Sequence, residues 1–317
     1  MTQAKGAAVG SGPRIRPLTW VISAASIIVA LLLAMYRPYV LVSGLQMAGL
    51  YAAIALPMAL ILGIVGIVNL AHGEFLMVGA YLAYILNRMI GIGPFAAIGP
   101  VVVLMLLLGL LTFQSTIRKV LAAPELNQLL LTFGLSMVLS EAVNLFATSQ
   151  PRGVSVDIAS ASATIGTYSF GIFDFVYDVA AVVILVGLQL FLRKTRVGRA
   201  AIAVGQNPRG AALVGINVDR TYLLVFGIAV GILGILGPIF LVRHSIFPTF
   251  GGSYTMKSFS LVAMAGIGNL TGIVWCSLGL GLAESFIKSF QGYGDWSDIV
   301  YFLLIVVVIL ARSRRAR

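Results

Sequence analysis

Long apolar runs are the feature that most constrains how this 317-residue chain can fold. The hydrocarbon core of a bilayer is about 30 Å thick, and a helix needs about 20 mainly apolar residues to cross it. Nine runs of suitable length and composition follow one another: 18–36, 40–68, 74–90, 95–113, 126–147, 173–192, 222–242, 273–290 and 297–311. Only 10% of the residues are charged, against roughly 25% in soluble domains. The chain is therefore predicted to be an all-α, polytopic transmembrane helical bundle.

Basic residues predict which side of the membrane the chain ends face. Arg14 and Arg16 precede the first span, and four arginines lie in 312–317, so both termini are predicted to be cytoplasmic. Two ends on one side require an even number of crossings. The short, Gly-interrupted segment 258–270 is therefore expected to cross, or nearly cross, as a tenth element. As a helix it would reach only about 20 Å, so it must be buried in protein rather than face lipid.

These signals divide the chain into three parts. Residues 1–17 are a cytoplasmic N-terminal tail, 18–311 a transmembrane domain, and 312–317 a basic cytoplasmic C-terminal tail. The run 18–36 is long for the apolar core of a signal peptide, so it is interpreted as a retained first span. The long cytoplasmic connection within the transmembrane domain is 193–220.

Composition and motifs argue against catalysis and nucleic-acid binding. The net charge of +11 is carried by short basic clusters between the spans, not by a basic stripe interleaved with aromatic residues. Cys276 is the only cysteine, which excludes an intrachain disulfide and a thiolate metal cluster. No P-loop motif occurs, and His72 and His244 fall on opposite sides in the predicted topology, which counts against a membrane-embedded enzyme. No catalytic residue, metal or cofactor is expected.

A polar turn between the second and third spans is the first candidate for function. Asn69, His72, Gly73 and Glu74 fall within six residues at a predicted membrane boundary. Gly73 permits a sharp turn, Asn69 can cap the following helix, and Glu74 lies in its first turn, where the helix dipole favours a carboxylate. The turn is interpreted either as a capped connection or as a segment lining a conduction path near its cytoplasmic end.

Two carboxylates lie well inside apolar spans. An ionised carboxylate in lipid is costly, so Glu141 and Glu284 are expected to face the bundle interior or a water-filled cavity. Each could hydrogen-bond between helices, with neighbours such as Asn144 or Ser285, or could serve transport. Pro57 is predicted to break the second span, which is longer than one crossing requires.

Glycine marks the short tenth element. Gly266, Gly268 and Asn269 stand at the end of the segment 258–270, and the sequence around them echoes residues 66–71. Transporters often contain repeated halves with broken helices at corresponding places. Glycines are also concentrated in the span 222–242, where they allow either tight helix packing or a pore wall made of backbone.

The cytoplasmic connection 193–220 contains a short helix with its own start and stop signals. Asn207 is a suitable N-cap, Pro208 fits the first helical position, and Gly215 can adopt the left-handed conformation that ends a helix. The helix between them, 209–214, has small alanine faces and buries little by itself. It is expected to dock into a groove of another protein.

Four segments of the chain carry a resemblance to a known family. They are 63–74, 131–135, 205–216, and 265–270 with the downstream Gly272. In order and spacing they resemble the inner-membrane permeases of bacterial ATP-binding-cassette importers for branched-chain amino acids, over nearly the whole chain. The Asn-Leu-Ala-His-Gly-Glu turn is the most specific of these matches.

The resemblance implies a multi-pass subunit of the bacterial inner membrane that works with a second permease subunit, identical or different. Cytoplasmic ATP-binding subunits and a periplasmic or lipid-anchored substrate-binding protein would complete the importer. The ATPase-docking residues would be Gln206, Asn207, Pro208, Arg209, Ala211, Ala212 and Gly215. The residues lining or shaping the pathway would be Asn69, His72, Gly73, Glu74, Gly266, Gly268 and Asn269.

The resemblance leaves other substrates and one other mechanism open. The same family also transports urea, short amides and aromatic acids, and the pore sequence does not separate these substrates. The docking helix lacks the acidic residue that the family often carries near the position of Arg209 or Gly210, a departure that concerns the identity of the docking partner. An ion-driven secondary transporter is the alternative mechanism, and it would require acidic residues paired at mid-membrane.

Overall fold

The computed structural model describes residues 37–290 except 148–149 and 166–167, together with the single residues Ile28, Ile299 and Val306. The predicted first and last spans, 18–36 and 297–311, lie outside the described residues, as do the two predicted tails.

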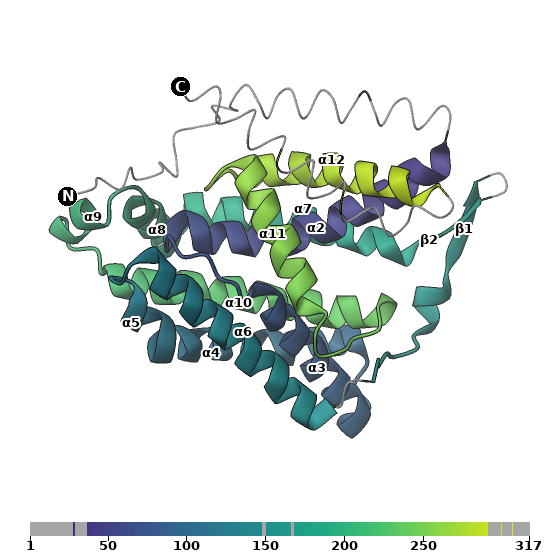
Figure 1. Cartoon of the computed structure of the whole chain (residues 1–317), viewed down its shortest axis with the longest axis horizontal. Coiled ribbons are helices and arrows are strands. Elements are labelled where there is room, and N and C mark those ends of the chain that lie inside the picture. The colour runs from purple at the N-terminus through teal and green to yellow at the C-terminus, as the bar shows by residue number, and fades with distance from the viewer. Residues whose placement is uncertain are drawn as a thin grey trace.

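Helices account for most of the described chain, and a single small hairpin is paired antiparallel (Figure 1). In chain order the elements are α2 (Pro38–Ile64), α3 (His72–Ile90), α4 (Pro94–Thr112), the π-helical η1 (Phe113–Ile117), α5 (Arg118–Val120), α6 (Glu125–Ala147), the 3-10 turn η2 (Asp157–Ser160), β1 (Ser162–Ile165), β2 (Tyr168–Gly171), the 3-10 turn η3 (Phe173–Phe175), α7 (Val176–Lys194), α8 (Arg196–Gln206), α9 (Pro208–Leu213), α10 (Val218–Arg243), α11 (Gly251–Ala265) and α12 (Leu270–Lys288).

Six helical segments of the described chain are long and apolar enough to cross a membrane. They are Pro38–Ile64, Pro94–Val120, Glu125–Ala147, Phe173–Lys194, Val218–Arg243 and Leu270–Lys288. The predicted all-α membrane bundle is thereby confirmed, because every predicted span that falls among the described residues is a helix. Helices α2 and α10 are mostly buried, whereas few residues of α6 are buried.

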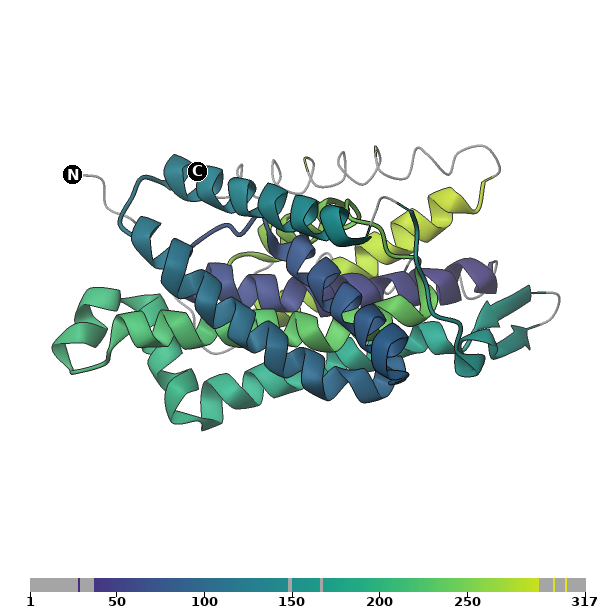
Figure 2. The ribbon, with the colours of Figure 1, turned by 90° about the horizontal axis from the view of Figure 1, so that it is seen from below.

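The molecule has two distinct ends along its long axis. Helices α8 and α9 lie at one end, and the β1–β2 hairpin lies at the other, in both views (Figures 1 and 2). We refer to them as the α9 end and the hairpin end. The segment predicted as one long loop, 193–220, contains both α8 and α9, so more of it is helical than the sequence indicated.

Glycines of α10 allow two neighbouring helices to approach closely. A Cβ added to Gly227 or Gly231 would meet Leu110 or Leu106 of α4. A Cβ added to Gly237 would meet the backbone of α3 at Gly79. Small residues at helical spacing pack backbones together in membranes. Tight packing therefore accounts for these glycines, and a pore wall of backbone is not needed to explain them.

Pro57 does not break the second span, which corrects the prediction. Helix α2 runs without interruption from Pro38 to Ile64 with Pro57 inside it. The chain leaves the helix at Val65, where Gly66 takes a φ of +80°. The last residues of the predicted span 40–68 are not helical; they belong to the connection between α2 and α3.

The short tenth element exists, but it lies earlier than the predicted 258–270. It is α11, fifteen residues from Gly251 to Ala265, and it runs obliquely across the long helices (Figure 1). Gly266 ends it with a φ of +93°, and Asn269 starts α12 by accepting a hydrogen bond from the Gly272 amide (3.0 Å). Residues 251–257, which precede the predicted element, are therefore helical too.

Candidate functional site

Helix α3 begins deep inside the bundle rather than at its boundary, which corrects the predicted place of the 69–74 turn. His72 is fully buried, and its Nε2 donates a hydrogen bond to the carbonyl of Ile54 (2.8 Å). Ile54 lies ten residues before the end of α2, about 15 Å along the helix. The segment between α2 and α3 is therefore re-entrant, and such backbone is tolerated at membrane depth only inside protein or beside water.

The contact between His72 and α2 lies beside Pro57. Proline has no N–H, so the carbonyl of Ala53 has no backbone donor from position 57 although α2 continues without interruption. Side chains of neighbouring helices commonly satisfy backbone groups near such prolines in membranes. His72 supplies a donor to the adjacent carbonyl, that of Ile54. Asn69 does not cap α3 as predicted, since its Oδ1 accepts from the amide of Ala71, before the helix begins.

The starts of α3 and α11 touch each other directly. A Cβ added to Gly73 would overlap the carbonyl of Gly251, and a Cβ added to Gly251 would overlap the backbone of Gly73. The amide of Gly73 also donates to Oγ1 of Thr255 in the second turn of α11 (2.7 Å). The polar turn predicted from the sequence therefore holds the first turns of α11.

Glu74 lies in the first turn of α3, as predicted, and is buried. The hydroxyl of Thr255 donates toward its Oε2 (3.4 Å), and Ser136 of α6 hydrogen-bonds the same carboxylate. Among the described residues its partners are hydroxyl groups rather than cations. Glu74 thus joins three helices, α3, α6 and α11, at the depth where α11 begins.

The other predicted pathway residues lie at the opposite end of α11. Gly266 and Gly268 have φ values of +93° and +79°, and Asn269 Nδ2 donates to the carbonyl of Ala265 while its Oδ1 caps α12. Since α11 has fifteen residues, about 22 Å separate this turn from Gly73. The two predicted sets are therefore not one site, and α11 connects them.

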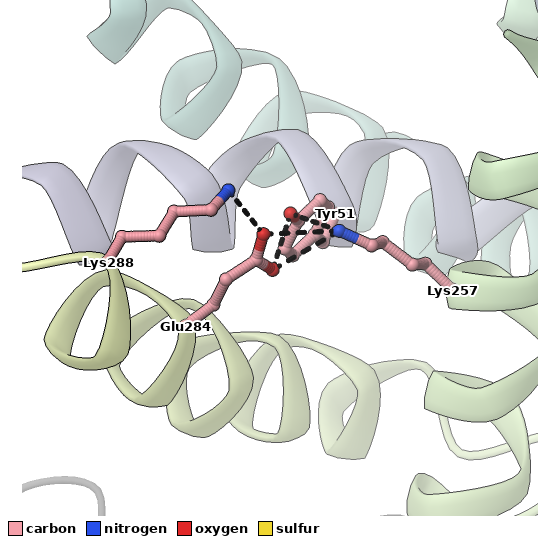
Figure 3. A network of polar contacts seen from close by, with 4 residues as sticks. All are labelled: Tyr51, Lys257, Glu284 and Lys288. Carbon is pink, nitrogen blue, oxygen red and sulfur yellow. Dashed lines mark hydrogen bonds and ion pairs between the residues drawn. The ribbon is translucent and has the colours of Figure 1, made fainter. Parts of the chain in front are cut away.

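A cluster that the sequence did not indicate as a whole joins α2, α11 and α12 (Figure 3). Glu284 of α12 is only 2% exposed. Its Oε2 accepts from the hydroxyl of Tyr51 (2.7 Å), and its Oε1 accepts from Nζ of Lys257 (3.2 Å) and of Lys288 (2.7 Å). Nζ of Lys257 also bonds the hydroxyl of Tyr51 (2.8 Å) and lies 4.7 Å from the centre of its ring. We call these four residues the Glu284 cluster.

The prediction for Glu284 was right about its burial and wrong about its partners. Ser285, its expected neighbour, instead donates to the carbonyl of Val40 (2.8 Å). Lys288 could have been found from its spacing, because residues four apart are neighbours on a helix. Lys257 could not, because it is distant from Glu284 in the sequence and its contact with Glu284 depends on the path of α11.

Glu141 departs from the expectation that it faces the bundle interior. It is exposed on the outer side of α6, and its Oε2 accepts from Asn144 Nδ2 on the same helix (3.3 Å). A carboxylate on a membrane-facing surface is costly unless another polar or protein surface covers it.

The two histidines, His72 and His244, contact different residues. His244 follows the end of α10 and stacks on Phe240, with ring centroids 4.5 Å apart. Burial lowers the pKa of His244, an effect that nearby Asp174 partly opposes.

The described residues contain no group of three or more His, Cys, Asp or Glu side chains able to hold a metal ion.

The α9 end carries the predicted docking helix, with its caps as expected. Asn207 Oδ1 accepts from the amide of Gly210 (2.9 Å), Pro208 is the first helical residue, and Gly215 has a φ of +84°. Ala211 is buried against the chain itself, so it seats α9 rather than contacts a partner. The remaining docking candidates, Gln206, Asn207, Pro208, Arg209, Ala212 and Gly215, are exposed.

Two apolar residues at the tip of α9 were not singled out from the sequence. Leu213 is 89% exposed and Val214 is 77% exposed. Helix α8 beneath them is fixed in place, since Gly198 packs on the backbone of Phe191, and Gly205 packs on that of Gly63. The tip is therefore a rigidly supported apolar projection.

Known proteins resemble the chain over most of its length. The family model for the permease component of the branched-chain amino acid transport system matches residues 40–309. The permease protein BraD of a high-affinity branched-chain amino acid transport system from Pseudomonas aeruginosa is 27% identical over 286 residues, 86% of this chain and 92% of that protein. The corresponding Escherichia coli K12 protein, LivH, is 28% identical over 84% of this chain and 91% of its own length.

A fructose import permease protein of Rhizobium meliloti, FrcC, is 28% identical over 43% of this chain and 40% of its own length. No solved structure matches the chain significantly. The family model covers far more than half of the chain, including the α3 turn, α9, α11 and the Glu284 cluster. The chain therefore belongs to the family of permease components of branched-chain amino acid transport systems.

Proposed function

We propose that the chain forms the translocation pathway of an ATP-driven importer, and that its substrates are branched-chain amino acids. Family membership and the named activities of BraD and LivH support this substrate class. The transmembrane permease domain would comprise 18–311, with 193–220 as its coupling region. Urea, amides and aromatic acids, considered from the sequence, have no observation in their favour.

The α9 end is proposed to face the cytoplasm. Basic residues are enriched in cytoplasmic connections of membrane proteins. Those at this end are Arg118, Lys119, Arg193, Lys194, Arg196, Arg199, Arg209 and Arg220. The basic residues near both chain ends, Arg14, Arg16 and those in 312–317, support cytoplasmic termini as well, and a periplasmic or lipid-anchored binding protein would deliver substrate at the hairpin end.

The observation that carries the ATP-driven mechanism is the apolar tip of α9. Leu213 and Val214 stand outside the spans, exposed at the end of a capped and supported helix. Exposed apolar groups rimmed by polar residues mark protein–protein contacts. A groove on a separate ATP-binding subunit is the proposed partner, and ATP hydrolysis takes place there.

The purified chain is expected to transport nothing by itself. In vesicles without ATP-binding subunits, [14C]leucine uptake should stay at the level of empty vesicles, with or without an imposed proton or sodium gradient. Adding the second permease subunit, the ATP-binding subunits, the binding protein and ATP should start uptake. Gradient-driven uptake by the chain alone would instead support the ion-driven alternative.

A second permease subunit is proposed to cover the exposed side of α6. Few residues of this helix are buried within the chain, and it carries Glu141 and Asn144 in an apolar span. Among the described residues, that carboxylate has Asn144 as its hydrogen-bond donor and would have no neutralising charge in lipid, whereas a second subunit, identical or different, can cover it with further polar groups.

A photo-cross-linking amino acid at Leu145 should capture a permease subunit in native membranes. Leu145 is 82% exposed, one turn beyond Glu141 on α6. The matched control is Val183 of α7, which is 62% exposed and should capture mainly lipid. Mass spectrometry of the adducts gives the result. Lipid adducts at Leu145, or equal capture of a permease at both positions, would contradict the placement of the second subunit.

A further inference from the structure

We infer that Lys257 and Lys288 are positioning residues that compete for one buried carboxylate, Glu284, so that α11 can leave its present position during transport and return to it. The inference rests on the proposed function, because it assigns a step of the ATP-driven cycle to α11. It concerns only residues of the Glu284 cluster and uses the contacts that each of them makes.

The two lysines reach the carboxylate from different elements. Lys288 lies on α12, four residues after Glu284, and donates to Oε1 at 2.7 Å. Lys257 lies on α11 and approaches both oxygens, at 3.2 Å and 3.3 Å. If α11 moves, Lys257 moves with it, whereas Lys288 stays beside Glu284 on the same helix.

Two lysines share the single carboxylate of Glu284, and this surplus of cations has an energetic consequence. Breaking a buried ion pair by removing one partner is strongly unfavourable, because the remaining charge is left uncompensated. Glu284 is 2% exposed, so it depends on these partners. With Lys288 retained, the carboxylate stays paired when Lys257 departs. The second lysine therefore makes the link between α11 and α12 reversible.

Lys257 is the partner better placed to depart. Its side chain is less exposed than that of Lys288, 16% against 42%, but of the two lysines it alone lies on α11, so a movement of α11 would carry it away from Glu284 (Figure 3). Helix α11 ends at Gly266, whose φ of +93° is a conformation that glycine adopts most readily, so the chain can change direction at this end while the start stays against Gly73.

The outer face of α11 is partly uncovered by the rest of the chain. Met256 is 49% exposed and Phe259 is 36% exposed. A fifteen-residue helix is too short to be held by lipid at both ends. Its position relative to α2 and α12 is therefore set by side-chain contacts. The buried ion pair between Lys257 and Glu284 is one of them.

The two lysine substitutions should change activity in opposite directions. The test uses the complete importer, in vesicles of phosphatidylethanolamine and phosphatidylglycerol, with ATP hydrolysis and leucine uptake measured together. Lys257→Gln releases α11, so ATP hydrolysis without binding protein should rise about fivefold, which is the low end of the range for coupling between sites. Uptake per ATP should fall at the same time. Lys288→Gln leaves Lys257 as the sole cation, so hydrolysis and uptake should both fall about fivefold with uptake per ATP unchanged.

A purely structural role gives a different pattern. It predicts that both variants lose assembled complex and activity in the same direction, and that result, or no change in either variant, would overturn the inference. If Lys257→Gln fails to assemble, Tyr51→Phe applies the same test, because it removes the hydroxyl that bonds Lys257 and Glu284 while keeping all charges. A smaller rise in uncoupled hydrolysis is then expected, and its absence would count against the role.

Failure of the proposed function can be distinguished from failure of this inference, since the unmodified importer would then show no ATP-dependent uptake.

Discussion

Replacing Leu213 and Val214 with aspartate is expected to abolish ATP-driven leucine uptake and to remove the ATP-binding subunit from the purified complex. These two side chains form the exposed apolar tip of α9. Burying an unpaired carboxylate in an apolar groove costs several kcal/mol, more than a docking contact of this size can offset. Co-purification through a tag on the permease, together with uptake in vesicles, measures both effects.

The matched control for this prediction is the pair Met89→Asp and Ile90→Asp. These residues are also adjacent, apolar and exposed at the C-terminal end of a helix, α3, and they lie at 79% and 66% exposure. They belong to the hairpin end, so the ATP-binding subunit should remain bound. Retention of that subunit by the Leu213 and Val214 variant would refute the docking role of α9.

Local signals in the sequence predicted α9 closely. Asn207, Pro208 and Gly215 act on the backbone within a few residues of themselves, and each was found in its expected role. The extents of the long spans were also predictable, since they depend on hydropathy over one bilayer thickness. The apolar tip was missed because the exposure of Leu213 depends on how α8 seats α9 against the bundle.

Non-local contacts explain the errors. The depth of His72 is set by its hydrogen bond to Ile54, eighteen residues earlier, and the pairing of Lys257 depends on residues of α2 and α12. The position of α11 was predicted several residues too late, because the glycines at its start read as a loop. They are instead required by the contact with α3. Glu141 was expected to face the bundle interior or a water-filled cavity because an ionised carboxylate in lipid is costly, but it is exposed on α6, which few other residues of the chain cover.

Gly73→Ala is expected to lower the unfolding temperature of the purified protein and to stop uptake, because a methyl group would force α3 and α11 apart. The obstacle is the carbonyl of Gly251, which is backbone and cannot rotate aside as a side chain can. Overpacking of this kind costs about 1–3 kcal/mol. Parting the two helices would also disturb the hydrogen bond from the Gly73 amide to Thr255, and with it the contact between Thr255 and Glu74.

The companion change, Gly251→Ala, should produce the same loss, since it adds its methyl group to the same contact from the other side. The double variant should cost less than the sum of the two single variants, because contacting residues couple and the first methyl group already separates the helices. Gly187→Ala on α7 is the control, since nothing lies within 4 Å of its added Cβ, and it should leave stability and uptake unchanged. Additive losses would show that Gly73 and Gly251 act at separate places, and α3 would then not hold the start of α11.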